Sequence, residues 1–411
     1  MKLSRHTAAY ISVFCALFIS GVDVSQAEVF GSWVKASMTA LVIMLALAFY
    51  LHSINSHKKI TNQTGLYWIA CLIALAGLSL AWSIDLSATN TAIVAWIYTL
   101  CAAYLLIGLG LPSAMTVIVV SFAWLCAISL ALSPIWPDAF MLNQGAMRFR
   151  GLFYGPHALA QPAAICLCII ASGILLVRKS VLFMLTLIIG ACLLLTFSRQ
   201  ALAAAMTGIV IAMLMRVRTY SHIAIISSIS IFLMIGLSYA YISDHGLTEI
   251  VSFDGGDDIQ SLTGRTFIWE ATLNLIQQKP YFGYGFGAGG IALHDYYQTI
   301  TTFGWTTYNA HNAFLQILLD FGVTGLILFL IMLGYWFVKS FSVLPVLFFP
   351  TFMCVMLLSF VERGFYSVGG FIPLILMLAL LSCNSCMNRA SSLNWPREVG
   401  HRLRRGWHSK I

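Results

Sequence analysis

Residues 114–133 read AMTVIVVSFAWLCAISLALS and contain no charged side chain. A helix of this length rises about 30 Å, which matches the hydrocarbon thickness of a bilayer. Further apolar runs lie, with soft boundaries, near residues 8–22, 33–51, 66–83, 91–110, 158–177, 181–197, 201–215, 221–242, 312–338, 341–360 and 366–383. The sequence therefore predicts an all-α polytopic membrane protein with about twelve transmembrane helices.

The composition supports this fold class. Of 411 residues, 60% are hydrophobic and only 9% are charged, and the mean hydropathy is +0.89. Soluble domains are about half apolar and a quarter charged, so a soluble enzyme and a disordered chain are both excluded. The apolar runs are continuous rather than alternating, which excludes a membrane β-barrel. The ten cysteines lie in or beside these runs and predict no disulfide framework; we interpret the Cys383-x-x-Cys386 pair as incidental.

The placement of basic residues predicts the orientation. With the N-terminus inside, the cytoplasmic segments contain most of the Lys and Arg residues, namely Lys2, Arg5, Lys58, Lys59, Arg178, Lys179, Arg216, Arg218, Lys339 and the tail. We therefore expect nine transmembrane helices in residues 1–242, one large outer loop at 243–311, three helices in 312–385 and a basic cytoplasmic tail at 386–411. The net charge is +8, but the Lys and Arg residues are scattered at helix ends and cluster only in the tail. This distribution argues against nucleic-acid binding and favours contact with membrane lipids.

Five arginines break this charge rule, because the same topology places all of them on the outer side. They are Arg148, Arg150, Arg199, Arg265 and Arg363. Arginine presents a fixed fork of donors that suits phosphate or carboxylate, so a cluster at the outer boundary fits an anionic lipid headgroup. The alternative is that each arginine pairs with a nearby acid such as Asp138, Asp258 or Glu362.

The outer loop contains one segment with helical periodicity. Apolar residues recur at helical spacing through 261–278, which predicts an amphipathic helix capped by Ser261 or Thr263, with Arg265 in its first turn. The glycine-rich segment 281–290 follows. It matches a G-x-G-x-x-G pattern, but no strand precedes it, so we reject a dinucleotide site. A flexible aromatic loop that folds over a sugar or lipid is the preferred interpretation.

His311 and Asn312 lie at the outer start of the tenth predicted span. A histidine in this position can take a proton from a hydroxyl near neutral pH, and Asn312 can orient it or cap the helix. The alternative is a helix cap beside an interfacial histidine. Asp320 lies nine residues further on, too deep to assist His311 directly, and is expected to have a partner inside the bundle.

His311-Asn312, followed after nine residues by Gly322-x-x-Gly325, resembles the signature of the O-antigen ligase superfamily, which includes O-antigen ligases, O-antigen polymerases and exopolysaccharide polymerases. Three further pieces resemble this family: Gly264-Arg265 with Trp269, Pro280 and Gly283-x-Gly285; Ser198-Arg199-x-Ala201; and Arg150-Gly-Leu-Phe before His157. The resemblance covers about residues 145–385.

The resemblance implies a glycosyltransferase of the bacterial inner membrane that uses a polyprenyl-diphosphate-linked glycan at the periplasmic face. The acceptor is lipid A–core in a ligase and a second lipid-linked glycan in a polymerase. His311 would deprotonate or orient the acceptor hydroxyl, and Arg199 and Arg265 would hold the donor diphosphate. The residues expected to shape the substrate pocket are Arg148, Arg150, His157, Asn312, Glu362 and Arg363. The resemblance implies no cofactor and no required metal.

The match at His311 slightly favours a ligase. The sequence leaves two alternatives to this interpretation. One is a polymerase of the same fold. The other is a flippase or transporter, which usually places ionisable residues near the bilayer midplane and contains internal repeats. Here the ionisable residues outside the basic cytoplasmic segments gather on the outer face, and only Asp320 is expected inside the bundle.

Overall fold

The computed structural model describes residues 41–44, 62–143, 146–216, 260–300, 307–341, 344–366 and 370–382. The predicted spans near 8–22 and 221–242 and the basic tail lie outside these residues. Of the predicted span 33–51, only residues 41–44 are described, and they are helical.

The described chain is mostly helical, as predicted. Five helices are long and apolar enough to cross a membrane: α3 with the short 3-10 turn after it (Gln63–Leu78, then Ser79–Ala81), α4 (Leu86–Ile107), α5 (Leu111–Leu132), α8 (Arg199–Arg216) and α12 (Ala313–Ser340). Four shorter apolar helices correspond to other predicted spans: α6 (Pro156–Ser172), α7 (Lys179–Leu195), α13 (Pro345–Val361) and α14 (Phe371–Leu381). The chain is a multi-pass membrane protein, and the count of twelve stays a prediction.

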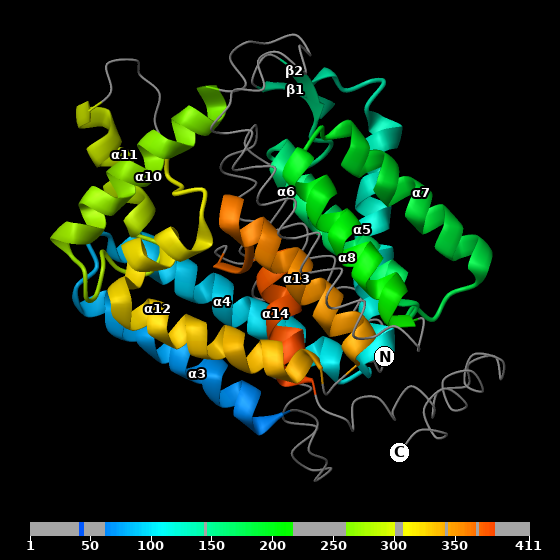
Figure 1. Ribbon diagram of the computed structural model, residues 1–411, viewed down its shortest axis with the longest axis horizontal. Helices are drawn as coiled ribbons and strands as arrows, with labels where there is room; N and C mark the ends of the chain where they lie inside the picture. Colours follow the sequence, from blue (N-terminus) through cyan, green and yellow to red (C-terminus); the bar gives the residue numbers. More distant parts are fainter. Residues whose placement is uncertain are drawn as a thin grey trace.

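Helix α14 packs against α3, α4 and α12 inside the bundle (Figure 1). All of its residues from Phe371 to Leu381 are buried. Because α14 has no polar side chain, other helices can cover every side of it without burying an unpaired polar group.

One end of the bundle carries Arg216 and Lys339, two of the basic residues that we assigned to the cytoplasmic side. Arg216 ends α8 and donates to the carbonyl oxygen of Ala171, at the end of α6, at 3.3 Å. Lys339 ends α12 and donates to the carbonyl oxygens of Leu380, at 3.1 Å, and Ser382. Cations at helix C-termini complement the helix dipole and the unsatisfied carbonyl groups there.

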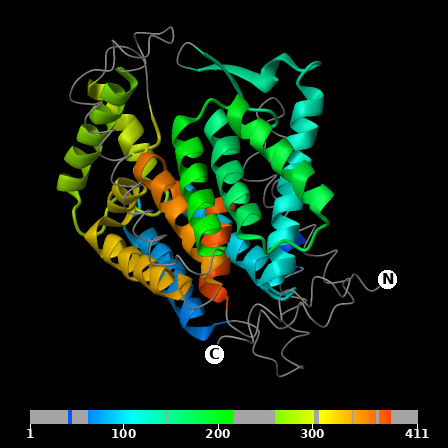
Figure 2. The same ribbon diagram turned by 45° about the vertical axis from the view of Figure 1, so that its right-hand side comes forward.

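The opposite end carries the parts that lie outside the bundle. Helices α10 (Gln260–Gln278) and α11 (Gly289–Ile300) lie side by side above the start of α12 in both views (Figures 1 and 2). A short antiparallel hairpin, β1 (Phe140–Asn143) and β2 (Ala146–Phe149), pairs Phe140 with Phe149 and follows a 3-10 turn at Pro137–Ala139. This hairpin corrects the all-α expectation, since four-residue strands beside a bundle leave no clear period in the sequence.

The amphipathic helix predicted at 261–278 is present as α10, and Ile268, Ala271 and Leu275 form its buried face. Two details of the prediction were wrong. Ser261 and Thr263 lie inside the helix rather than ahead of it, so neither is the cap, and Arg265 lies beyond the first turn. Phe267, one of the apolar residues of this stretch that helical spacing places on the buried face, is exposed.

Helix α12 is broken at Gly322, where φ is +64° and ψ is −161°. This conformation is essentially restricted to glycine, and a Cβ atom here would lie 2.3 Å from the carbonyl carbon of Tyr281. The glycine-rich segment fills the break, because Tyr284 N–H donates to Leu319 O at 2.9 Å and Val323 N–H donates to Pro280 O at 2.8 Å. The segment 281–290 is therefore a structural part of the α12 break.

Candidate active site

His311 is held in place by the two asparagines around it. Its backbone has a φ of +48°, a left-handed conformation that is uncommon for residues other than glycine and recurs at functional sites. The His311 N–H donates to Oδ1 of Asn309 at 3.0 Å, which closes a tight turn before the helix. Directly after it, Oδ1 of Asn312 accepts from the N–H groups of Phe314 and Leu315 and caps α12.

Glu362 is the partner of the His311 ring. It follows the last residue of α13, and its Oε2 lies 3.2 Å from Nδ1 of His311. Asn312 Nδ2 donates to the carbonyl oxygen of Phe360 at 3.1 Å, so the start of α12 is tied to the end of α13 beside this pair. The other carboxylate oxygen of Glu362 lies 3.3 Å from the guanidinium of Arg265, on α10.

The charge state of Glu362 follows from these contacts. Burial alone would raise its pKa, since the side chain is only 6% exposed. The hydrogen bond with His311 and the charges of His311, His157 and Arg265 outweigh burial and lower the pKa from 4.5 to about 2. The carboxylate is therefore ionised at neutral pH. The His311 side chain keeps 28% of its surface exposed, and Arg265 keeps 22%.

A second histidine belongs to the same cluster. His157 opens α6 and lies within electrostatic range of Arg148, Arg265, His311 and Glu362. Gln200, in the first turn of α8, lies between His157 and Glu362. Its Nε2 is 3.4 Å from Nδ1 of His157 and 3.5 Å from Oε1 of Glu362. Residues from α6, α8, α10, α12 and α13 thus meet at one point.

The remaining predicted residues take different places. Arg199 is exposed at the start of α8, next to Gln200. Arg150 donates from Nε to the carbonyl oxygen of Asp138 at 2.6 Å and lies over the ring of Trp136, which favours a role in holding the hairpin. Arg363 donates to the carbonyl oxygen of Tyr308. The side chain of Asn312 serves as the helix cap, which was the alternative considered for it.

Asp320 has partners inside the bundle, as expected. Its carboxylate accepts from the N–H groups of Gly287 and Gly289, from the hydroxyl of Tyr366 and from Nε2 of Gln316. It therefore joins the glycine-rich segment to α12 and to the 3-10 turn Gly364–Tyr366 that follows Glu362.

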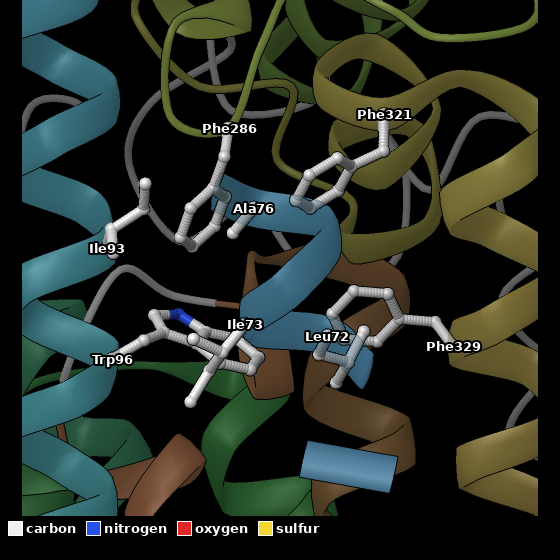
Figure 3. A pocket seen from close by; sticks show the side chains of 8 residues that line it. All are labelled: Leu72, Ile73, Ala76, Ile93, Trp96, Phe286, Phe321 and Phe329. Carbon is white, nitrogen blue, oxygen red and sulfur yellow. The ribbon is translucent and has the colours of Figure 1, made fainter. Parts of the chain in front are cut away.

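The aromatic side chains of the glycine-rich segment do not all face outwards. Phe286 is 1% exposed and stacks on Phe321, with the ring centroids 5.2 Å apart. Figure 3 shows both rings pointing toward Trp96 and Phe329 around a gap of about 10 Å³, no more than the space of one water molecule. The expectation of a flexible loop that folds over substrate was therefore wrong for Phe286, which is a core residue.

Comparison with known families tests the resemblance. Residues 182–330 match the family model described as O-Antigen ligase. These residues form a segment that is similar to the O-antigen ligase family. The predicted resemblance is thereby confirmed, over a shorter stretch than the 145–385 that we expected. The match indicates a membrane glycosyltransferase of the ligase and polymerase type. No curated protein matches the chain.

The O-antigen ligase segment contains Arg199, Arg265 and His311, whereas His157 and Glu362 lie outside it. Sequence reasoning missed two features of the site. Gln200 occupies the unassigned position of Ser198-Arg199-x-Ala201, and a polar amide in the first turn of an apolar helix was the available signal. Glu362 was assigned to the substrate pocket, which stays a prediction, and its contact with His311, 51 positions earlier in the chain, was not predicted.

Proposed function

We propose that this protein transfers a polyprenyl-diphosphate-linked glycan to lipid A–core at the periplasmic face of the bacterial inner membrane. The observation that carries the proposal is the His311–Glu362 pair beside the guanidinium of Arg265. A buried carboxylate on one ring nitrogen fixes the orientation and tautomer of the imidazole, as in other histidine bases.

The reaction follows from this arrangement. Because Nδ1 of His311 is engaged by Glu362, Nε2 remains to take the proton from the acceptor hydroxyl. The acceptor oxygen then bonds to the anomeric carbon of the donor, and the bond from that carbon to the diphosphate oxygen breaks. Negative charge develops on the departing polyprenyl diphosphate, where Arg265 and Arg199 supply compensating positive charge. Such electrostatic stabilisation is often the largest single contribution to catalysis.

Ligase activity and polymerase activity are separated by their products. We expect cells that lack the protein to accumulate long lipid-linked chains and to leave lipid A–core uncapped. Single lipid-linked repeats in place of long chains would contradict the ligase proposal and favour the polymerase.

Reconstitution tests the chemistry itself. Purified protein in proteoliposomes should transfer glycan from the lipid-linked donor to lipid A–core, and His311→Ala should abolish transfer. Thr299→Ala is the matched control, since Thr299 is exposed on α11, outside the cluster. Full activity of His311→Ala would contradict the proposal.

A further inference from the structure

A second cavity is lined by close sequence neighbours of the His311–Glu362 pair. Its volume is about 150 Å³, and its walls come from the start of α11, the first turns of α12 and the turn after α13. Tyr308, which lines it, precedes His311 by three residues, and Arg363 directly follows Glu362. A cavity of roughly this size can hold one six-membered ring, whereas ligand pockets for larger molecules measure about 300–1,000 Å³.

The Asp320 carboxylate, which lines this cavity, already accepts as many hydrogen bonds as it can. Oδ1 of Asp320 accepts from Gly289 N–H at 3.0 Å and from Gln316 at 3.2 Å, and Oδ2 accepts from Gly287 N–H at 2.9 Å and from the Tyr366 hydroxyl at 2.6 Å. Four bonds take up the four lone-pair positions of a carboxylate. Asp320 therefore contributes negative charge and a rigid wall rather than a free acceptor.

The free hydrogen-bonding capacity belongs to Arg363. This side chain gives one N–H to the carbonyl oxygen of Tyr308, and its buried Nε has no hydrogen-bond partner among the described residues. Because this Nε is out of reach of the cavity, a ligand there would bond to the remaining guanidinium N–H groups, of which Tyr308 uses one. On the same wall the Tyr308 ring stacks on His294, with the centroids 4.1 Å apart and the planes 10° from parallel.

The charges decide between an anion and a neutral ligand. Arg363 and Asp320 bring one charge of each sign to the cavity, so a bound anion would gain little and would meet the Asp320 carboxylate. A neutral, oxygen-rich ring offers an acceptor to Arg363 and places no charge beside Asp320.

We propose that this cavity is a subsite for a single neutral sugar ring, held beside His311. The inference rests on the proposed function, because the ring would belong to the acceptor or to the donor glycan. The small volume explains how one terminal ring is selected while the rest of the glycan stays outside.

Direct binding tests the subsite without catalysis. Saturation-transfer NMR on the full chain in nanodiscs, with glucose, galactose and mannose as separate probes, should give a signal for at least one hexose. The signal should disappear in Ile291→Phe, which fills the cavity from α11, and in Arg363→Met, which removes the donor. It should persist in Thr299→Phe, on the exposed side of the same helix, and in His311→Ala.

Absence of a signal for all three hexoses, or a signal that survives both cavity variants, overturns the subsite. Stronger binding of inorganic phosphate at this position overturns its neutral character. Because His311→Ala keeps the hexose signal, failure of the subsite and failure of the transferase proposal are distinguishable.

Steady-state transfer then identifies the source of the ring. If the ring belongs to the acceptor, Ile291→Phe raises the KM for the acceptor at least about tenfold and leaves the KM for the donor unchanged. If the ring belongs to the donor, Ile291→Phe raises the KM for the donor and leaves the KM for the acceptor unchanged. Unchanged KM values for both substrates contradict the proposal.

Discussion

At the residue scale, Arg265 has one observed partner, Glu362, and one proposed partner, the donor diphosphate. It pairs with Glu362 at 3.3 Å and still keeps 22% of its side chain exposed, so part of its donor fork is open to a diphosphate. We expect Arg265→Ala to lower the transfer rate in proteoliposomes about a hundredfold or more. Lys279→Ala removes a positive charge just beyond the other end of α10 and is the control. Equal losses in the two variants would mean that general charge, rather than the site, matters.

Glu362 gives the protein a predictable response to acid. Its pKa is lowered from 4.5 to about 2, so the carboxylate stabilises the folded state fully above about pH 4.5, and this contribution is lost as pH falls toward 2. We expect the unfolding temperature of the wild type to fall more steeply than that of Glu362→Gln between about pH 5 and pH 2.5. Parallel curves for the two proteins would argue against an ionised, paired Glu362.

At the element scale, the break in α12 depends on one glycine. Gly322→Ala would force a Cβ atom to within 2.3 Å of Tyr281 and demand a conformation that alanine avoids, so we expect the free energy of unfolding to fall by about 1–3 kcal/mol. Gly334→Ala is the matched control in the same helix. No atom outside the local helix lies within 4 Å of its Cβ position, and helix propensity favours alanine by about 1 kcal/mol. Thermal unfolding of the two variants measures the difference.

The elements also show how far sequence reasoning reached. The spacing of Ile268, Ala271 and Leu275 predicted α10, because the buried face of an amphipathic helix has an apolar residue every three to four positions along the sequence. The break at Gly322 was not predicted, because it depends on contacts with Tyr281 and its neighbours. These residues lie about 40 positions earlier in the chain, and local spacing does not show such contacts. For the same reason the sequence placed His311 and Glu362 on the same outer side but could not pair them.

At the scale of the whole molecule, the His311–Glu362–Arg265 cluster lies at one end of the bundle, and Arg216 and Lys339 lie at the other. The predicted orientation places α11 in the periplasm and the start of α7 in the cytoplasm. In a background without native cysteines, Asp295→Cys on α11 should react with a membrane-impermeant thiol reagent in spheroplasts. Ser180→Cys, at the start of α7, should react only after the membrane is permeabilised. The reverse pattern would contradict the orientation.

The coupling between His311 and Glu362 tests the central claim most directly. We would measure the transfer rates of His311→Ala, Glu362→Gln and the double variant in proteoliposomes. If Glu362 acts through the His311 ring, the double variant should be no slower than His311→Ala alone. Losses that multiply, or a His311→Ala variant with the wild-type rate, would contradict the account.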